Sequence, residues 1–320
     1  MKKTTLFSLV ALALAACSEE DGGGTTGGQQ ELRLTSRLET AARAGVPSER
    51  IAENETVWAW VSDAGKNGTD AALYNAEQLT AGSDGELLGN VLLFPASGNA
   101  VNIRALHGTF TNPAFEAGIT AFPEKVGFSV ERNQAESDAY TKSDLLYSAV
   151  DGVAPKGYIT EQPLYFYHML SKLELKIVKK PNAVNHVVTG VTIDDVAVDG
   201  TLTLREGADL TQQPVREAMI IGGEQTGAVS MPKRLDEGET YEFIIVPQKM
   251  GGKTMTFTVV GGIPMSYTFP KNKVFESGKR YLYTITLADW RLTIDESSIF
   301  AWDTAEEITD EIDLSSTPVL

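Results

Sequence analysis

Alternating apolar and polar residues recur along most of the chain, and a period of two is typical of half-buried β-strands. In residues 172–177, Leu173, Leu175 and Ile177 share one face, while two lysines and a glutamate share the other. The same pattern predicts strands at 31–39, 56–63, 101–108, 125–130, 172–180, 187–194, 200–206, 241–248, 253–261, 265–270 and 280–287.

Turn signals separate these runs, and helical patterns are scarce. The turn dipeptides are Asn67-Gly68, Asp84-Gly85, Asp151-Gly152 and Asp199-Gly200. Only short segments, such as 75–79 and 136–145, have a pattern that could hold a turn or two of helix. Many short strands joined by glycine-rich turns predict an all-β protein built from β-sandwiches.

The chain length suggests two domains. Residues 109–162 are rich in loops, with prolines at 113, 123 and 155 and another just beyond at 163. The strand patterns after this stretch are longer and more closely spaced. We therefore expect an N-terminal β-sandwich domain at 31–160 and a C-terminal one at 161–320, each of ordinary domain size. There is no internal repeat of fixed period.

The first residues form a targeting segment. Two lysines precede an apolar run at 6–16, which is shorter than the ~20 residues that a membrane-spanning helix needs. The run ends in Leu-Ala-Ala-Cys, which resembles a bacterial lipobox, and Cys17 is the only cysteine of the chain. Residues 1–16 are thus predicted to be a lipoprotein signal peptide that signal peptidase II removes. Cys17 would then carry acyl chains such as palmitate and anchor the protein to the outer membrane. The alternative is an ordinary secretory signal with an incidental thiol.

Residues 17–30 have the composition of an acidic and glycine-rich tether. The cluster Ser-Glu-Glu-Asp at 18–21 resembles the surface-export signal of Bacteroidetes lipoproteins, and the alternative is a solvated linker. The glycines and threonines that follow have no apolar surface to bury, so this stretch is expected to be flexible.

The net charge of −16 makes some partners improbable. It becomes −18 when Lys2 and Lys3 are lost with the signal peptide. So much negative charge argues against nucleic acid and against an anionic lipid surface as partners. It fits an extracellular coat protein.

The sequence has no signature of an enzyme, a metal site or a cofactor site. His107, His168 and His186 have no metal-ligand spacing, and no nucleophile motif is present. The glycine-rich segments lack the lysine of a phosphate-binding loop. Trp58 and Trp60 share a strand face, where they could form a platform for a sugar, but core packing is the simpler interpretation. We expect neither catalytic residues nor bound cofactors.

Several stretches in a fixed order resemble the fimbrillin family of Bacteroidales, the subunits of type V pili. After the lipobox come "LRLTSRLETAARAG" (32–45) and "VWAWVSD" (57–63). "SDLLYS" (143–148) and "PLYFYHMLSKLELKI" (163–177) are similar to mid-chain segments of the family, and "GKRYLYTITL" (278–287) and "SIFAWD" (298–303) to its last ones. The resemblance implies two tandem transthyretin-like β-sandwich domains and a role as a subunit of a surface fimbria that supports adhesion.

The resemblance also implies how subunits would join. In the family, an Arg-specific protease removes the first strand with its lipid anchor, and an extended segment of another fimbrial subunit fills the groove by strand addition. Arg43 is the expected cleavage residue here because small residues surround it and it follows the first strand. Arg37 and Arg50 are the weaker alternatives. Arg43 could also be only a loop charge, and Ala42 stands where the family often has threonine.

The tail at 304–320 is the candidate donor strand. Ile308, Ile312 and Leu314 fall on one strand face, with Asp310 as an exception. Residues 308 and 312 also fit a short helix or a frayed acidic tail.

Two other functions remain open from the sequence. The protein could be a surface lipoprotein that binds glycans and does not polymerise, or, more remotely, an outer-membrane hydrolase. The pattern alone does not assign a stalk, tip or anchor role, nor an adhesion target.

Overall fold

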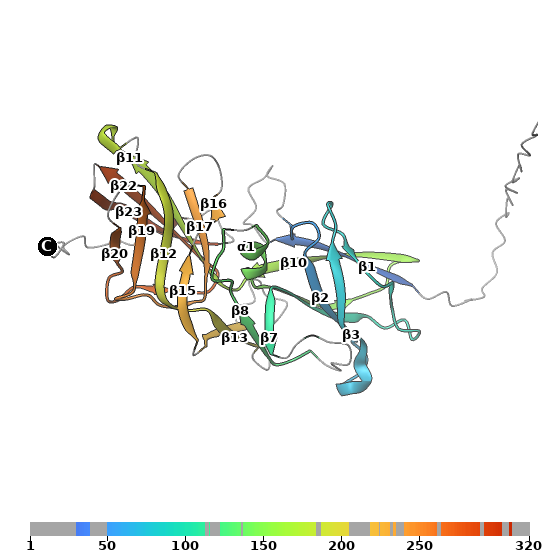
Figure 1. Ribbon diagram of the computed structural model, residues 1–320. Helices are drawn as coiled ribbons and strands as arrows, with labels where there is room; N and C mark the ends of the chain where they lie inside the picture. The colour runs from blue at the N-terminus through green and yellow to red at the C-terminus, as the bar shows by residue number, and fades with distance from the viewer. Residues whose placement is uncertain are drawn as a thin grey trace, which may run out of the picture.

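The computed structural model shows an elongated all-β protein, as the strand pattern predicted (Figure 1). β1 lies toward one end of the molecule and β23 toward the other. The structure describes residues 30–38, 50–112, 115, 122–135, 137–183, 187–204, 218–223, 225–230, 233–234, 240–260, 264–288, 291–302 and 307–308. In this part of the chain, no helix combines the length and the hydropathy that crossing a bilayer requires.

The largest sheet contains the first strand. Its strands are β1 (Glu31–Leu38), β2 (Thr56–Asp63), β3 (Ala72–Ala81), β4 (Leu87–Leu88), β5 (Leu92–Leu93), β6 (Val101–His107), β9 (Leu146–Val153) and β10 (Ile159–His168). Their order across the sheet is β4-β3-β2-β6-β9-β10-β1-β5. β1 runs parallel to β10, and the other pairs are antiparallel. The two edge strands, β4 and β5, are close in sequence, so the sheet curls until its edges meet.

A second large sheet lies at the other end of the chain. It has the order β16-β17-β11-β22-β23-β24, with β11 and β22 parallel. The bounds are β11 (Ser171–Lys179), β16 (Lys233–Arg234), β17 (Thr240–Ile245), β22 (Lys279–Ala288), β23 (Arg291–Ala301) and β24 (Glu307–Ile308).

Three smaller sheets accompany the two large ones in the described part of the chain. One has the order β15-β12-β19-β20, another β14-β13-β8-β7, and a third pairs β18 with β21. The bounds are β7 (Thr109–Asn112), β8 (Lys125–Ser129), β12 (Val188–Ala197), β13 (Asp199–Leu204), β14 (Ala218–Gly222), β15 (Thr226–Ser230), β18 (Gln248–Lys249), β19 (Thr254–Val259), β20 (Met265–Thr268) and β21 (Val274–Phe275). The helical segments among the described residues are α1 (Ser137–Ser143) and two 3-10 turns, η1 (Gly68–Ala71) and η2 (Pro181–Ala183).

The apolar faces of these sheets form two core clusters. The one that concerns the site lies inside the curled sheet, and β1 contributes Leu32 and Leu34 to it. The other residues of this cluster are Ile51, Val57, Ala59, Val61, Leu79, Ala81, Leu87, Leu92, Phe94, Val101, Ile103, Ala105, Leu146, Val153, Leu164 and Phe166. The larger cluster holds the aromatic residues of the C-terminal strands, together with Trp60 and Tyr147.

The structure contains a strand where each alternating run predicted one, but it also contains strands that the pattern did not predict. Residues 75–79, considered for a helical turn, belong to β3, whereas 136–145 does contain α1. Ala76 in β3 has a φ of 47°, and the pairing of β2 with β3 changes register nearby. This β-bulge breaks the alternation by which the strand could have been recognised. The division into domains at residue 160 stays a prediction.

Candidate assembly site

The first strand has the two faces that its sequence predicted. Leu32, Leu34 and Ser36 are buried, with exposed fractions of 2%, 3% and 3%. Leu38 is half-buried, and Arg33 and Arg37 on the other face are exposed. β1 therefore presents an apolar side, ending in a buried serine, to the core of the curled sheet.

One edge of β1 is fully paired. All eight of its residues, from Glu31 opposite Ile159 to Leu38 opposite Phe166, pair with β10 in a parallel ladder. β10 pairs with β9 only at Tyr167 and His168. Pro163, which has no N–H, lies in the part of β10 that pairs with β1 alone, where a proline can be tolerated. β1 is therefore the main hydrogen-bonding partner of residues 159–166.

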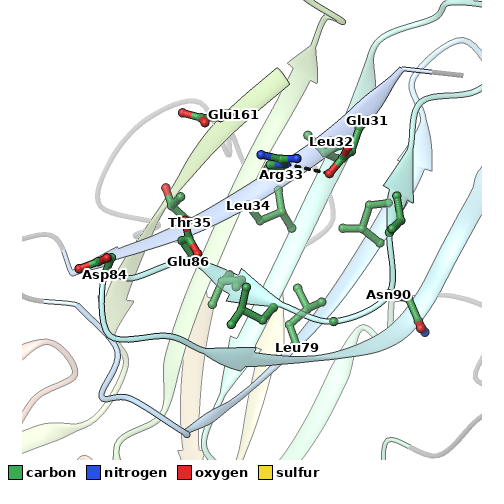
Figure 2. A pocket seen from close by; sticks show the side chains of 15 residues that line it. Glu31, Leu32, Arg33, Leu34, Thr35, Leu79, Asp84, Glu86, Asn90 and Glu161 are labelled. Carbon is green, nitrogen blue, oxygen red and sulfur yellow. Dashed lines mark hydrogen bonds and ion pairs between the residues drawn. The ribbon is translucent and has the colours of Figure 1, made fainter. Parts of the chain in front are cut away.

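The other edge of β1 is only partly paired. Glu31 and Leu32 pair with Leu93 and Leu92, and Thr35 forms an isolated bridge with Glu86. Between these points the chain at 87–91 leaves a pocket of about 380 Å³ beside β1. Figure 2 shows Leu34 and Leu79 in this pocket, with Glu31, Arg33 and Glu161 around it. The leucines that line it are Leu32, Leu34, Leu79, Leu87, Leu88 and Leu92.

The rim of this pocket is acidic. Glu31, Asp84, Glu86 and Glu161 line it together with one cation, Arg33. The Nε atom of Arg33 donates a hydrogen bond to Oε1 of Glu31 at 2.8 Å. The hydrogen bond and charge of Glu31 raise the pKa of Arg33 above its usual value, and the charges of Glu161 and Glu86 add to this effect. The positive charge of Arg33 thus offsets the negative charges of the acidic residues around it on the outer face of β1.

The end of β1 packs closely against a turn at Gly85. The backbone N–H of Ser36 donates to the Gly85 carbonyl at 2.6 Å, and its hydroxyl donates to the same oxygen at 3.1 Å. Gly85 has a φ of +83°, and a Cβ atom added to it would lie 2.9 Å from the carbonyl oxygen of Ser36. Position 85 of the turn therefore requires glycine. The contact also places the side chain of Ser36, the third inward residue of β1, in a confined and polar site.

The described residues include two of the three candidate cleavage residues. Arg37 pairs with Tyr165 inside the ladder, so cleavage there would require this end of β1 to leave β10. Arg50 is exposed, and its guanidinium lies 3.9 Å from Asp84. Arg43 and the predicted lipid attachment residue Cys17 lie outside the described residues. All three candidate cleavage residues follow most or all of β1 in the chain.

The described residues of the predicted donor tail pair with the second large sheet of the same chain. β24 pairs with β23, with Ile308 opposite Ile299 and Glu307 opposite Phe300. Ile312 and Leu314 lie outside the described residues. Whether this tail is a donor strand stays a prediction.

The tryptophan pair, His107 and His168 pack inside the fold. Trp60 is 4% exposed and packs edge-on against Phe115 and Phe122, and Trp58 contacts Phe115. Neither forms an open platform for a sugar. The described residues include no group of three or more His, Cys, Asp or Glu side chains that could hold a metal ion.

Sequence reasoning predicted β1 as a strand with one apolar face but missed what surrounds it. β10, which carries the ladder, was not among the predicted strands, because Pro163 and a run of aromatic residues interrupt its alternation. Gly85 was recognised only as part of a turn dipeptide. Its contact with Ser36 joins residues far apart in sequence, so no local pattern could have indicated it.

A comparison with the profiles of known protein families identifies the family of this chain. The profile of the fimbrillin-like family matches residues 42–302 of the chain. The chain belongs to the fimbrillin-like family. The resemblance seen in the sequence motifs is therefore confirmed. No curated protein sequence matches the chain.

Solved structures have the same fold as this fimbrillin-like protein. A proposed cell adhesion protein from Bacteroides ovatus is 16% identical with a TM-score of 0.63, covering 89% of this chain and 100% of its own. A similar protein from Bacteroides uniformis is 18% identical with a TM-score of 0.57, covering 86% and 99%. The tip fimbrial protein Mfa3 from Porphyromonas gingivalis, with a C-terminal truncation, is 8% identical with a TM-score of 0.50, covering 86% and 100%. At these identities the likeness shows the fold alone.

Proposed function

We propose that this protein is a structural subunit of a cell-surface type V fimbria that polymerises by strand addition and supports adhesion. Membership of the fimbrillin-like family supports the role of fimbrial subunit. The observation that carries the mechanism is the asymmetric pairing of β1, which is complete on β10 and partial on its other edge.

Loss of β1 would leave a groove suited to an extended peptide. The backbone groups of residues 159–166 would lose their partner, and the core around Leu32 and Leu34 would open to water. Burying a leucine side chain contributes about 1.5–3 kcal/mol, so the empty groove is costly. A strand from another subunit restores both the ladder and the burial, which favours assembly over the open monomer.

Processing supplies the trigger in this proposal. Signal peptidase II would remove residues 1–16, and Cys17 would anchor the subunit in the outer membrane through its acyl chains. An Arg-specific protease would then cut after Arg43, with Arg37 and Arg50 as alternatives, and release β1 together with the anchor. The chain would have no catalytic role, and its partners would be other fimbrial subunits.

The experiment that tests the function compares the parent with Arg43→Ala on gels run without boiling. After treatment with an Arg-specific protease, the parent should give a ladder of heat-sensitive bands and an N-terminus just after the cut. Arg43→Ala should stay monomeric and keep its first strand. If the variant assembles as well as the parent, with no cut at Arg37 or Arg50, the proposed trigger is wrong.

The anchor has its own test. Metabolic labelling with a fatty acid should mark the parent and not Cys17→Ala, because the thiol is the attachment point. The Cys17→Ala protein should also leave the membrane fraction. A variant that is still labelled would show that the lipid is attached elsewhere.

A further inference from the structure

The sheet of β15, β12, β19 and β20 has an outer face made of hydroxyl residues. Along β19, buried apolar residues alternate with threonines that point away from the core. The ladder places Thr256 of β19 between Thr192 of β12 and Ser266 of β20. We call this surface the threonine face, and its side chains are Thr192, Thr254, Thr256, Thr258, Ser266 and Thr268.

The threonine face is uncharged, although the chain as a whole has a net charge of −16. None of its six side chains ionises. By contrast, the outward residues Lys172, Glu174 and Lys176 of β11, in the second large sheet, are all charged. Along β12 the face ends at the exposed Asp194, and Lys253, just before β19, forms an ion pair with Asp195. A second acidic molecule therefore meets less electrostatic repulsion at the threonine face than at a charged face.

Hydroxyl groups of this face are already paired with one another. The hydroxyl oxygens of Thr254 and Thr268 lie 3.4 Å apart, and those of Thr256 and Ser266 lie 3.2 Å apart. Because these pairs persist when water leaves, covering the face does not bury these hydroxyls without a hydrogen bond. Threonine is β-branched, so its side chain also has little rotamer freedom to lose.

We propose that the threonine face is a contact surface between two copies of this protein, in which the same face of each copy packs against the other. The face lies in the half of the molecule remote from β1 (Figure 1). The contact therefore leaves the first strand and its pocket free. This inference goes beyond the proposed function and does not need strand addition. In a polymer, the contact would join filaments side by side.

The geometry favours a flat protein surface over a sugar as the occupant. Sites for small molecules are concave and lined largely by apolar and aromatic side chains. The aromatic residues of β19 and β20 point the other way, because Phe257 is buried and Tyr267 packs against the core opposite Met255. The threonine face thus lacks a ring on which a sugar would stack.

The contact uses the face of the sheet rather than its edge. β20 is the last strand of this sheet and has no charged residue to prevent another strand from pairing with it. However, Pro264 and Pro270 flank β20, and prolines at an edge strand hinder the addition of a further strand. Face-to-face packing does not need the backbone groups that these prolines restrict.

Each contact is small, so its strength must come from repetition. Neighbouring strands lie about 4.8 Å apart, and three strands present less area than a stable protein interface needs. A filament or a dense surface layer presents many copies of the face, and the total affinity grows with the number of contacts. We therefore expect monomers in dilute solution and association between surfaces that carry many copies.

Beads coated with the uncut protein test this contact without any polymer. The chain without its signal peptide is attached through Cys17, its only cysteine, so that all copies have the same orientation. Parent beads should cluster, as measured by light scattering. Added salt should promote clustering, because it screens the repulsion between the acidic chains. Absence of clustering, or its loss at high salt, overturns the inference.

Substitutions at the centre of the face give the matched comparison. Thr256→Glu should reduce clustering by at least about tenfold, because like charges would meet across the contact. Thr284→Glu is the control, since Thr284 is also half-buried and points outward, but on β22 of the second large sheet. Its beads should cluster like the parent. A mixture of Thr256→Lys and Thr256→Glu beads should cluster more than either alone, which also shows that both variants are folded. Equal clustering of the Thr256→Glu and Thr284→Glu beads overturns the inference.

Filaments separate this inference from the proposed function. If the cleaved parent polymerises, electron micrographs should show filaments joined side by side, and Thr256→Glu filaments of the same length should stay single. Single filaments of the parent would overturn the inference while the function stands. If the parent beads cluster but the cleaved protein never polymerises, the inference stands and the proposed function is wrong.

Discussion

At the scale of residues, the described part of the chain contains a buried polar cluster between α1 and the second large sheet. The Tyr140 hydroxyl donates a hydrogen bond to Oε2 of Glu242 at 2.5 Å, and Lys172 forms an ion pair with the same carboxylate. Lys172 also lies 6.0 Å from the ring of Trp302, which stacks on His168. Removing one of these side chains would leave its partners buried without the interaction. The cluster therefore holds α1 against the sheet.

Buried tyrosines predict a loss of stability in alkali. Burial, followed by the charge of Glu242, raises the pKa of Tyr140 well above 10, and burial also raises the pKa of Tyr147 and Tyr283. Above about pH 10 the unfolded chain releases tyrosine protons that the folded chain retains. The contribution of these tyrosines to the free energy of unfolding should therefore be constant below this pH and fall as the pH rises further.

Denaturant melts combined with tyrosinate absorbance measure this effect. The absorbance of the buried tyrosines should appear together with unfolding. If their tyrosinate signal develops near pH 10 in a protein that stays folded, the burial argument fails.

Two tyrosine-to-phenylalanine substitutions should have different effects on stability. Tyr140→Phe removes the donor to Glu242 and should lower the free energy of unfolding by about 1–3 kcal/mol. The Tyr147 hydroxyl is buried and has no hydrogen-bond partner within the described residues. Tyr147→Phe should therefore leave stability unchanged or raise it by about 1 kcal/mol. Urea melts of both variants at neutral pH measure these changes in the free energy of unfolding. A larger loss of stability from Tyr147→Phe than from Tyr140→Phe would contradict the prediction.

At the scale of elements, sequence reasoning succeeded where alternation was regular. β1, β11 and β22 were predicted because each buries alternate residues along most of its length. It failed for β3, where the bulge at Ala76 shifts the pattern, and for β10, where Pro163 and aromatic residues hide it. The pairing of β1 with β10 joins segments more than 120 residues apart, and such pairing is a property of the folded sheet rather than of either segment.

Truncation of a β1 leucine should separate monomer stability from assembly. Leu34→Ala should lower the free energy of unfolding of the uncut protein by about 2–5 kcal/mol, because Leu34 is buried in the core. The exposed Arg37→Ala is the matched control, with a change of less than about 0.5 kcal/mol. Once β1 has been removed by the protease, neither variant should polymerise to a different extent from the parent. A polymerisation defect after cleavage would mean that β1 stays in the assembly.

At the scale of the whole molecule, removal of the tail should abolish polymers without unfolding the subunit. A chain that ends after Asp303 loses β24, which pairs through only two residues at the edge of its sheet. Its melting temperature should therefore stay close to that of the parent, measured by calorimetry. Size-exclusion chromatography after protease treatment should show monomers only. A much lower melting temperature would show that the tail is an internal strand of its own sheet, and normal polymers would show that another segment is the donor.

The parallel ladder of β1 on β10 has a mechanical consequence. Both strands run roughly along the long axis of the molecule (Figure 1). If a strand of a neighbouring subunit takes the place of β1, a pull along the fibre loads all rungs of that ladder in shear at once. A pull across the strands would break the rungs one after another. Force spectroscopy on linked dimers should therefore find a higher rupture force along the fibre than across it.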